Sequence, residues 1–176
     1  SDLVGSLDQL ERVKTISEIY INPNFASVLE ARFVESLNRL GATSPGAIER
    51  MDVRSLAAAI RSAGYFNQKA KRLKAIAAYF RANRKGTREK LLALDGVGPE
   101  TADSIMLYAF NVPYFVVDAY TRRLFGRLAL VDPSAPYEEI RDRFERNLPR
   151  RVFVYKEYHA LIVEHGLTIR RKVMLP

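Results

Sequence analysis

Gly96 and Gly98 flank a single apolar residue, Val97, between one expected helix that ends near Leu94 and another that starts at Pro99. Glycine tolerates positive φ and lets another backbone approach closely. The amides at the start of the second helix point outward beside the positive end of its dipole, where an anion such as a DNA phosphate binds. The pattern predicts a phosphate-binding hairpin with Val97 packed between the helices. The alternative is an ordinary helix end followed by a proline start.

Asp118 follows an apolar stretch, residues 114–117, and opens the next amphipathic helix. Aspartate is among the best N-cap residues, so one interpretation is a purely structural cap. The helix dipole and the free amides also keep such a carboxylate ionised. An ionised carboxylate beside a phosphate-binding hairpin has the chemistry for cleaving an N-glycosidic bond, because it stabilises oxocarbenium charge on the sugar and orients an attacking water.

Basic residues gather at the start of the expected helix over 67–83, at Lys69, Lys71, Arg72 and Lys74. Such a run is usually a solvated face. Positive charge at a helix N-terminus opposes the helix dipole, however, and an anionic partner offsets that cost. Phosphate contact by Lys69 is therefore the preferred interpretation.

Nearly every segment of the chain follows a helical period, and the connections are short and often contain Gly or Pro. Ser44 and Pro45 predict an N-cap and the first helical position. The one strand-like stretch, residues 114–117, is too short for a sheet, so the sequence predicts a compact all-α fold. Expected helices cover residues 26–40, 51–63, 67–83, 87–94, 99–110, 118–130, 135–147 and 151–165.

The composition narrows the chemistry further. The 176 residues suit one domain or two small helical lobes, and the net charge of +8 favours a polyanionic partner. The chain has no cysteine, which excludes disulfides, thiolate nucleophiles, Cys-ligated zinc and iron–sulfur clusters. The two histidines, His159 and His165, are too few for a histidine-built metal site, and we expect core or capping roles for them. No apolar run approaches the ~20 residues of a membrane helix, and the first residues carry no signal pattern, as in a trimmed or processed end.

The sequence Leu-x-Gly-Val-Gly-x-x-Thr-Ala over residues 94–102, followed by Val-Val-Asp-x-Tyr-x-x-Arg over 116–123, resembles the helix-hairpin-helix DNA glycosylases of the endonuclease III superfamily. Residues 64–73 are similar to the family's Gly-Tyr-x-Asn-x-Lys-Ala segment. The resemblance covers about residues 40–166. It implies a single all-α domain over 1–176 with a two-lobed, endonuclease III-like fold, its hairpin motif at about 87–110, and DNA in the cleft between the lobes.

Three departures from the family pattern refine the expected chemistry. Glu100 stands where bifunctional members carry a lysine, and a carboxylate forms no Schiff base with deoxyribose. The His-Gly pair at 165–166 is not followed by the four-cysteine tail of the cluster-bearing members. In the family, a Gln-containing segment fills the gap that a flipped base leaves in the duplex. This chain has a different sequence there, and Asn22 or Asn24 is expected to take that role. These features are most similar to the small, cluster-free 3-methyladenine DNA glycosylases.

The resemblance implies that Asp118 is the catalytic carboxylate and that Glu100 lines the base pocket. It implies no cofactor, apart from a Na⁺ or K⁺ ion on the hairpin carbonyls of Leu92, Leu94 and Val97. The expected DNA-binding residues are Gly96, Val97, Gly98, Thr101, Lys69, Asn67, Asn22 and Asn24. Candidates for stacking on a flipped base, most of them expected in the core, are Tyr20, Phe25, Tyr65, Phe66, Tyr114 and Tyr120.

The expected function is therefore a monofunctional DNA N-glycosylase of base excision repair that removes a damaged, alkylated purine from double-stranded DNA. It is expected to act as a monomer in the cytoplasm, on the nucleoid, without a membrane partner. One alternative is a glycosylase for uracil, mismatched thymine or oxidised bases. The other is a non-catalytic helix-hairpin-helix DNA-binding protein.

Overall fold

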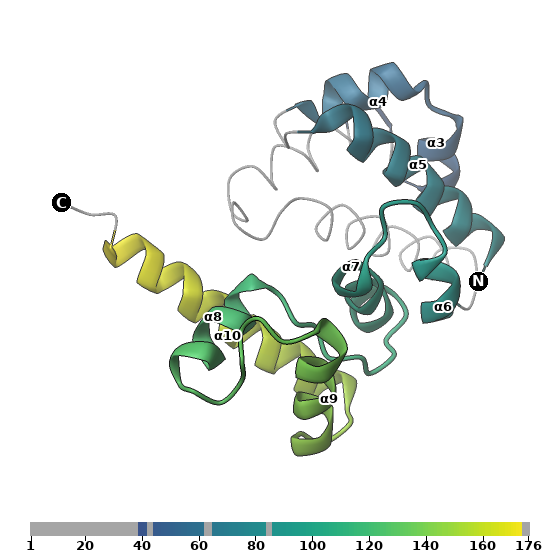
Figure 1. Ribbon diagram of the computed structural model, residues 1–176. Coiled ribbons are helices and arrows are strands. Elements are labelled where there is room, and N and C mark those ends of the chain that lie inside the picture. Colours follow the sequence, from purple (N-terminus) through teal and green to yellow (C-terminus); the bar gives the residue numbers. More distant parts are fainter. Residues whose placement is uncertain (1–38, 42–43, 62–64, 84–85, 174–176) are drawn as a thin grey trace. The chain divides into compact units, whose positions relative to one another are not determined.

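The computed structural model describes residues 39–41, 44–61, 65–83 and 86–173, and every regular element among them is helical (Figure 1). The all-α prediction is therefore confirmed for this part of the chain. None of its helices combines the length and the apolar composition needed to span a bilayer. The chain divides into two compact units, one ending at Thr101 and the other starting at Ala102.

Among its described residues, the first unit contains α3 (Pro45–Arg50), α4 (Val53–Ala59) and α5 (Phe66–Ala82) ahead of the hairpin. Ser44 caps α3 as predicted, because its hydroxyl accepts a hydrogen bond from the Ala47 N–H at 3.2 Å and Pro45 opens the helix. The predicted helix over 51–63 is wrong in its extent. Asp52 separates α4 from α3, since its side chain caps α4.

Helix α5 is the packing centre of this unit. Its buried residues recur every three or four positions, at Ala70, Leu73, Ile76, Ala77 and Phe80. This spacing gives one apolar face. Both α3 and α4 pack against α5, and Figure 1 shows the three helices together.

Helix α7 (Pro99–Ser104) begins in the first unit and ends in the second, which also contains η3 (Ile105–Ala109), α8 (Ala119–Arg127), α9 (Tyr137–Asn147) and α10 (Val152–Val173). The predicted helix over 99–110 is α-helical only as far as Ser104. It continues as one π-helical turn, in which the Phe110 N–H donates to the Ile105 carbonyl at 3.2 Å. In this turn four of the five side chains are buried: Ile105, Met106, Leu107 and Ala109.

The strand-like residues are an extended segment that passes through the core of the second unit. Phe115, Val116 and Val117 are all buried. The Phe115 ring stacks on Phe144 of α9 with centroids 4.4 Å apart, and Tyr155 of α10 meets its edge at 5.5 Å. The run is apolar because it is surrounded by helices, and no strand pairs with it in the described part of the chain.

Helix α10 extends past the predicted end at His165 and continues to Val173. Gly166 does not terminate it. A Cβ atom at Gly166 would collide with the ring of Tyr120, which occupies that space. The glycine therefore serves close packing between α8 and α10 rather than helix termination.

Candidate active site

The hairpin between α6 (Arg88–Leu92) and α7 is a tight turn around Val97. The Val97 N–H donates to the carbonyl of Leu94 at 3.1 Å, and the Val97 side chain is buried as predicted. Gly96 has a φ of +74°, a conformation that favours glycine, whereas Gly98 has no positive φ. Both glycines are exposed, so the backbone of the turn is accessible to another molecule.

The side chain of Arg72, on α5, lies against Gly96. A Cβ atom at Gly96 would collide with Nε, Cδ and Cζ of Arg72, whereas one at Gly98 would meet nothing within 4 Å. The φ of Gly96 therefore favours glycine, and a side chain there would also displace the flexible end of Arg72. The sequence pointed to Lys69 as the basic residue at the hairpin, which stays a prediction, and the structure places the side chain of Arg72 from the same cluster against Gly96.

The other predicted DNA-binding residues differ in exposure. Asn67 is exposed, Lys69 is half-buried, and burial lowers the pKa of Lys69. Lys74, a further member of the basic cluster, donates to the Met51 carbonyl and so links α5 to the end of α3. Within the hairpin segment, Glu100 is exposed and Thr101 is half-buried. Asn22 and Asn24 lie outside the described residues.

Asp118 is the N-cap of α8 and is only 2% exposed. Its Oδ1 accepts two hydrogen bonds from Thr121, one from the backbone N–H at 2.7 Å and one from the hydroxyl at 2.8 Å. The capping role considered for Asp118 is therefore confirmed. The cap uses one carboxylate oxygen only, and Oδ2 has no hydrogen-bond partner among the described residues.

His159, on α10, faces this second oxygen. Its Nε2 lies 3.6 Å from Oδ2 of Asp118, and its Nδ1 lies 2.8 Å from the hydroxyl of Tyr108 on η3. Sequence reasoning missed this arrangement and assigned His159 to the core or to a cap. Tyr108 and His159 are 51 residues apart, and no local spacing signals their contact.

The pKa values follow from these contacts. Burial alone would raise the pKa of Asp118, but His159 and the two Thr121 donors outweigh it and hold that pKa below its ordinary value. For Tyr108, burial and then the charges of Asp118 and Glu157 raise the pKa well above its usual range. At neutral pH the site thus contains a carboxylate ion and a phenol that keeps its proton.

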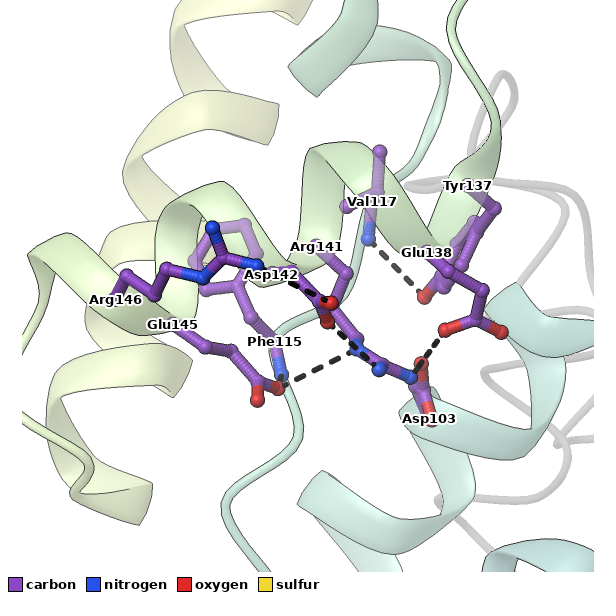
Figure 2. A network of polar contacts seen from close by, with 9 residues as sticks. All are labelled: Asp103, Phe115, Val117, Tyr137, Glu138, Arg141, Asp142, Glu145 and Arg146. Carbon is purple, nitrogen blue, oxygen red and sulfur yellow. Dashed lines mark hydrogen bonds and ion pairs between the residues drawn. The ribbon is translucent and has the colours of Figure 1, made fainter.

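Helix α9 holds the segment that leads into Asp118 (Figure 2). Its Glu145 accepts the backbone N–H of Phe115 at 2.8 Å, and its Tyr137 hydroxyl accepts that of Val117 at 3.3 Å. Alternate residues along one edge of the extended segment are therefore bound by side chains instead of by a neighbouring strand. This arrangement satisfies buried backbone groups and fixes the direction in which the chain enters α8.

Arg141 lies between these two anchors on the same face of α9 (Figure 2). Its guanidinium is surrounded by carboxylates, at 3.6 Å from Asp103, 2.5 Å from Glu138, 2.9 Å from Asp142 and 3.8 Å from Glu145. The ion pair with Asp103 joins the end of α7 to α9. The same cluster thus fixes α9 and, through Glu145, the backbone before Asp118.

The aromatic residues predicted to stack on a flipped base differ in their exposure. Tyr65 is 83% exposed and has a φ of +46°, whereas Tyr120 is buried in the core. Tyr20 and Phe25 lie outside the described residues.

No group of acidic or histidine side chains in the described ranges is suited to a metal ion. A cation on the hairpin carbonyls of Leu92, Leu94 and Val97 stays a prediction.

Residues 13–150 match the HhH-GPD superfamily of base excision DNA repair proteins, a stretch well over half of the chain. The chain therefore belongs to the HhH-GPD superfamily.

This chain is similar in sequence to two proteins described as a DNA repair glycosylase and an endonuclease III. The chain is 46% identical over 141 residues to a "Putative DNA repair glycosylase" of Methanocaldococcus jannaschii, covering 73% of this chain and 64% of that protein. It is 28% identical over 134 residues to an endonuclease III of Sulfolobus acidocaldarius, covering 72% of this chain and 59% of the relative. The chain thus spans less than two thirds of the length of either.

Solved structures share the fold. The H. pylori 3-methyladenine DNA glycosylase MagIII, bound to 1,N6-ethenoadenine, has a TM-score of 0.78 and 24% identity, covering 95% of this chain and 88% of that one. A trapped endonuclease III–DNA covalent intermediate has a TM-score of 0.68 and 21% identity, covering 80% and 68%. The predicted endonuclease III-like fold is confirmed by these similarities.

Proposed function

We propose that this chain is a monofunctional DNA N-glycosylase that binds duplex DNA, flips out a damaged base and hydrolyses its glycosidic bond. The observation that carries the proposal is the carboxylate of Asp118, which is buried and yet has a lowered pKa. One of its oxygens is held by Thr121, and the other has no hydrogen-bond partner among the described residues. A fixed, ionised carboxylate of this kind suits the stabilisation of positive charge on a sugar.

In the proposed reaction the bond between C1′ and the base nitrogen breaks, and its electron pair leaves with the base. Positive charge develops on C1′ and the ring oxygen, where the Asp118 carboxylate stabilises it. A water molecule then adds to C1′, and Asp118 accepts the proton that the water loses and passes it to solvent. The products are a free base and an abasic site with an intact backbone.

The hairpin is proposed to bind a DNA phosphate. The exposed turn at Gly96 and Gly98 presents backbone amides, and Arg72 adds a guanidinium at the same turn. We assign supporting contacts to Asn67, Lys69 and Thr101. Because these contacts release counterions, affinity for duplex DNA should fall steeply with salt and be similar for unrelated sequences. Fluorescence anisotropy with two unrelated duplexes across a salt series tests this, and an affinity independent of salt would contradict it.

An alkylated purine is the proposed substrate. Alkylation of a ring nitrogen places positive charge on the base, which then leaves as a neutral molecule with little need for acid assistance. Recognition is proposed to come from stacking of the cationic base on an aromatic ring. The name of the structurally similar 3-methyladenine DNA glycosylase supports this choice of base.

A panel of duplexes, each with one damaged base, tests the proposal directly. It includes 3-methyladenine, 7-methylguanine, 1,N6-ethenoadenine, uracil, mismatched thymine and 8-oxoguanine, and base release is followed at excess protein. Release of the alkylated purines is the expected result. Release of only uracil, thymine or the oxidised base would keep the glycosylase class and overturn the substrate. Binding without any release would favour a non-catalytic DNA-binding protein.

A further inference from the structure

Two buried polar atoms of the second unit face each other, Oδ2 of Asp118 and Nε2 of His159. They are 3.6 Å apart, and neither has a hydrogen-bond partner among the described residues. An N–H···O bond measures about 2.7–3.2 Å, so the pair lies within charge–charge range but is longer than a hydrogen bond. Buried groups without partners are few in native proteins, and two that point at each other call for an explanation.

Tyr108 contributes to the choice of which nitrogen of His159 carries a proton. Its hydroxyl lies 2.8 Å from Nδ1, and burial keeps the phenol protonated. The Tyr108 hydroxyl can donate to Nδ1 or accept from it, but a bare Nε2 would place its lone pair against the Asp118 carboxylate. The neutral imidazole therefore favours the tautomer with its proton on Nε2, in which Tyr108 donates to Nδ1. When the imidazole is charged, both nitrogens carry protons. In either state an N–H of His159 points toward Oδ2 of Asp118.

Two charged groups of α10 act on Tyr108, the partner of His159. Lys156 lies 5.5 Å from the centre of the Tyr108 ring, and its ammonium also donates to Asn111 at 2.8 Å. Glu157 acts on Tyr108 through its charge. On α8, Thr121 supplies both donors to the opposite oxygen of Asp118. His159 is thus the group that meets Oδ2.

We infer that His159 is a positioning residue for Asp118, and that Tyr108 acts through His159 by holding the proton on Nε2. The inference rests on the proposed glycosylase function. Thr121 fixes one oxygen of the carboxylate, and His159 fixes the other, so that the group cannot rotate away from the sugar. Catalytic hydrogen bonds are often long before substrate binds and tighten in the complex. His159 also lowers the pKa of Asp118 against the effect of burial, which alone would raise it.

The first test compares two substitutions of His159. His159→Phe keeps an aromatic ring but removes the donor, and it should lower the single-turnover rate at neutral pH about tenfold. Because the pKa of Asp118 rises without its partner, the acid limb of the pH–rate profile should move up by about one pH unit. His159→Gln returns an N–H donor near the position of Nε2 and should restore the rate to within about threefold.

The second test addresses Tyr108. Tyr108→Phe should shift the acid limb in the same direction in the wild-type background and have no further effect in the His159→Phe background. If His159→Phe does not fold, Tyr108→Phe is tested in the His159→Gln background instead. It should have no further effect there, because the glutamine amide keeps its N–H without a hydroxyl partner. The matched control is His165→Gln, an exposed histidine on the same helix, which should change neither rate nor profile.

A readout without DNA separates this inference from the proposed function. The pKa of Asp118 is measured from its carboxyl ¹³C shift in the wild-type protein and in the His159 variants, with circular dichroism to verify folding. A raised pKa in His159→Phe without any base release by the wild type would keep the contact and overturn the glycosylase assignment. Base release by the wild type, with the ¹³C titration and the pH–rate profile both unchanged in His159→Phe, would overturn the positioning role.

Discussion

The guanidinium of Arg141 lies 3.6 Å from the carboxylate of Asp103, a side chain with no exposed surface. Asp103 is at the end of α7, and Arg141 is in the middle of α9. Their ion pair therefore couples the helix after the hairpin to the helix whose Glu145 binds the backbone ahead of Asp118. Buried charges of this kind are tolerated because they are paired, and loss of one partner leaves the other uncompensated.

Arg141→Met should consequently lower the free energy of unfolding by about 3 kcal/mol, since it leaves the buried Asp103 without its guanidinium. Urea denaturation at neutral pH measures the change. The matched control is Arg146→Met on the same helix. Arg146 is 80% exposed and lies 3.8 Å from Asp142, so its loss should change stability by less than about 0.5 kcal/mol. Equal effects of the two substitutions would contradict a buried role for Arg141.

The two hairpin glycines should differ in their tolerance of a methyl group. Gly96→Ala forces alanine to a φ of +74° and a Cβ atom into Arg72, which should cost about 1–2 kcal/mol of stability. Gly98→Ala meets no atom within 4 Å and should stay within about 0.5 kcal/mol of the wild type. Thermal denaturation of both variants checks this. An additional Arg72→Ala substitution should recover part of the loss at Gly96, and a recovery at Gly98 instead would show that the hairpin is arranged differently.

Features with a local signal were predictable from the sequence. A serine followed by proline predicted the start of α3, and an aspartate after an apolar run predicted the cap of α8. Val97 was expected to be buried because it lies between two glycines at the junction of two helices. In each case the side chain and the backbone groups that it satisfies are within a few residues of each other, so spacing alone carries the information.

Features that depend on distant partners were not predictable. The contact of His159 with Tyr108 and Asp118 joins three elements, and no periodicity indicates which histidine faces a carboxylate. The π-helical turn after Ser104 was also missed, because its apolar residues fit a regular helix equally well. The packing role of Gly166 had no local signal either, since the ring that requires a glycine there comes from another helix.

Asp118→Asn should abolish base excision while leaving the fold and DNA affinity nearly unchanged. Asparagine caps a helix about as well as aspartate, so α8 should keep its start. It has no negative charge to stabilise the oxocarbenium ion and accepts no proton from water, which should lower the single-turnover rate at least about 100-fold. Quenched-flow base release and anisotropy with the same duplex give the two values. A variant with wild-type rates would reduce Asp118 to a cap.

The lowered pKa of Asp118 also predicts how stability depends on pH. A carboxyl group whose pKa is lower in the folded state than its ordinary value of 3.8 stabilises the fold above that value. This stabilisation is lost as the pH falls through the folded-state pKa. The wild type should therefore lose more stability than Asp118→Asn when urea denaturation is repeated from about pH 6 to pH 3. Asp132→Asn, in an exposed turn where the carboxylate accepts hydrogen bonds from Ser134, should reduce the acid sensitivity less. Parallel curves for all three proteins would contradict the prediction.

The last prediction concerns strand cleavage and depends on Glu100. A lyase needs an amine that attacks C1′ of the sugar and forms an iminium ion, which borohydride reduces to a stable adduct. Glu100 supplies a carboxylate at the position where bifunctional relatives carry that amine, so base release should leave a backbone that breaks only on heating with alkali. Borohydride should trap no protein–DNA adduct at a rate that matches base release. Glu100→Lys should introduce weak trapping, with Glu100→Gln as the control that removes the charge without adding an amine. Nicking by the wild-type protein without alkali, with trapping at the same rate, would overturn the monofunctional assignment and direct attention to another lysine.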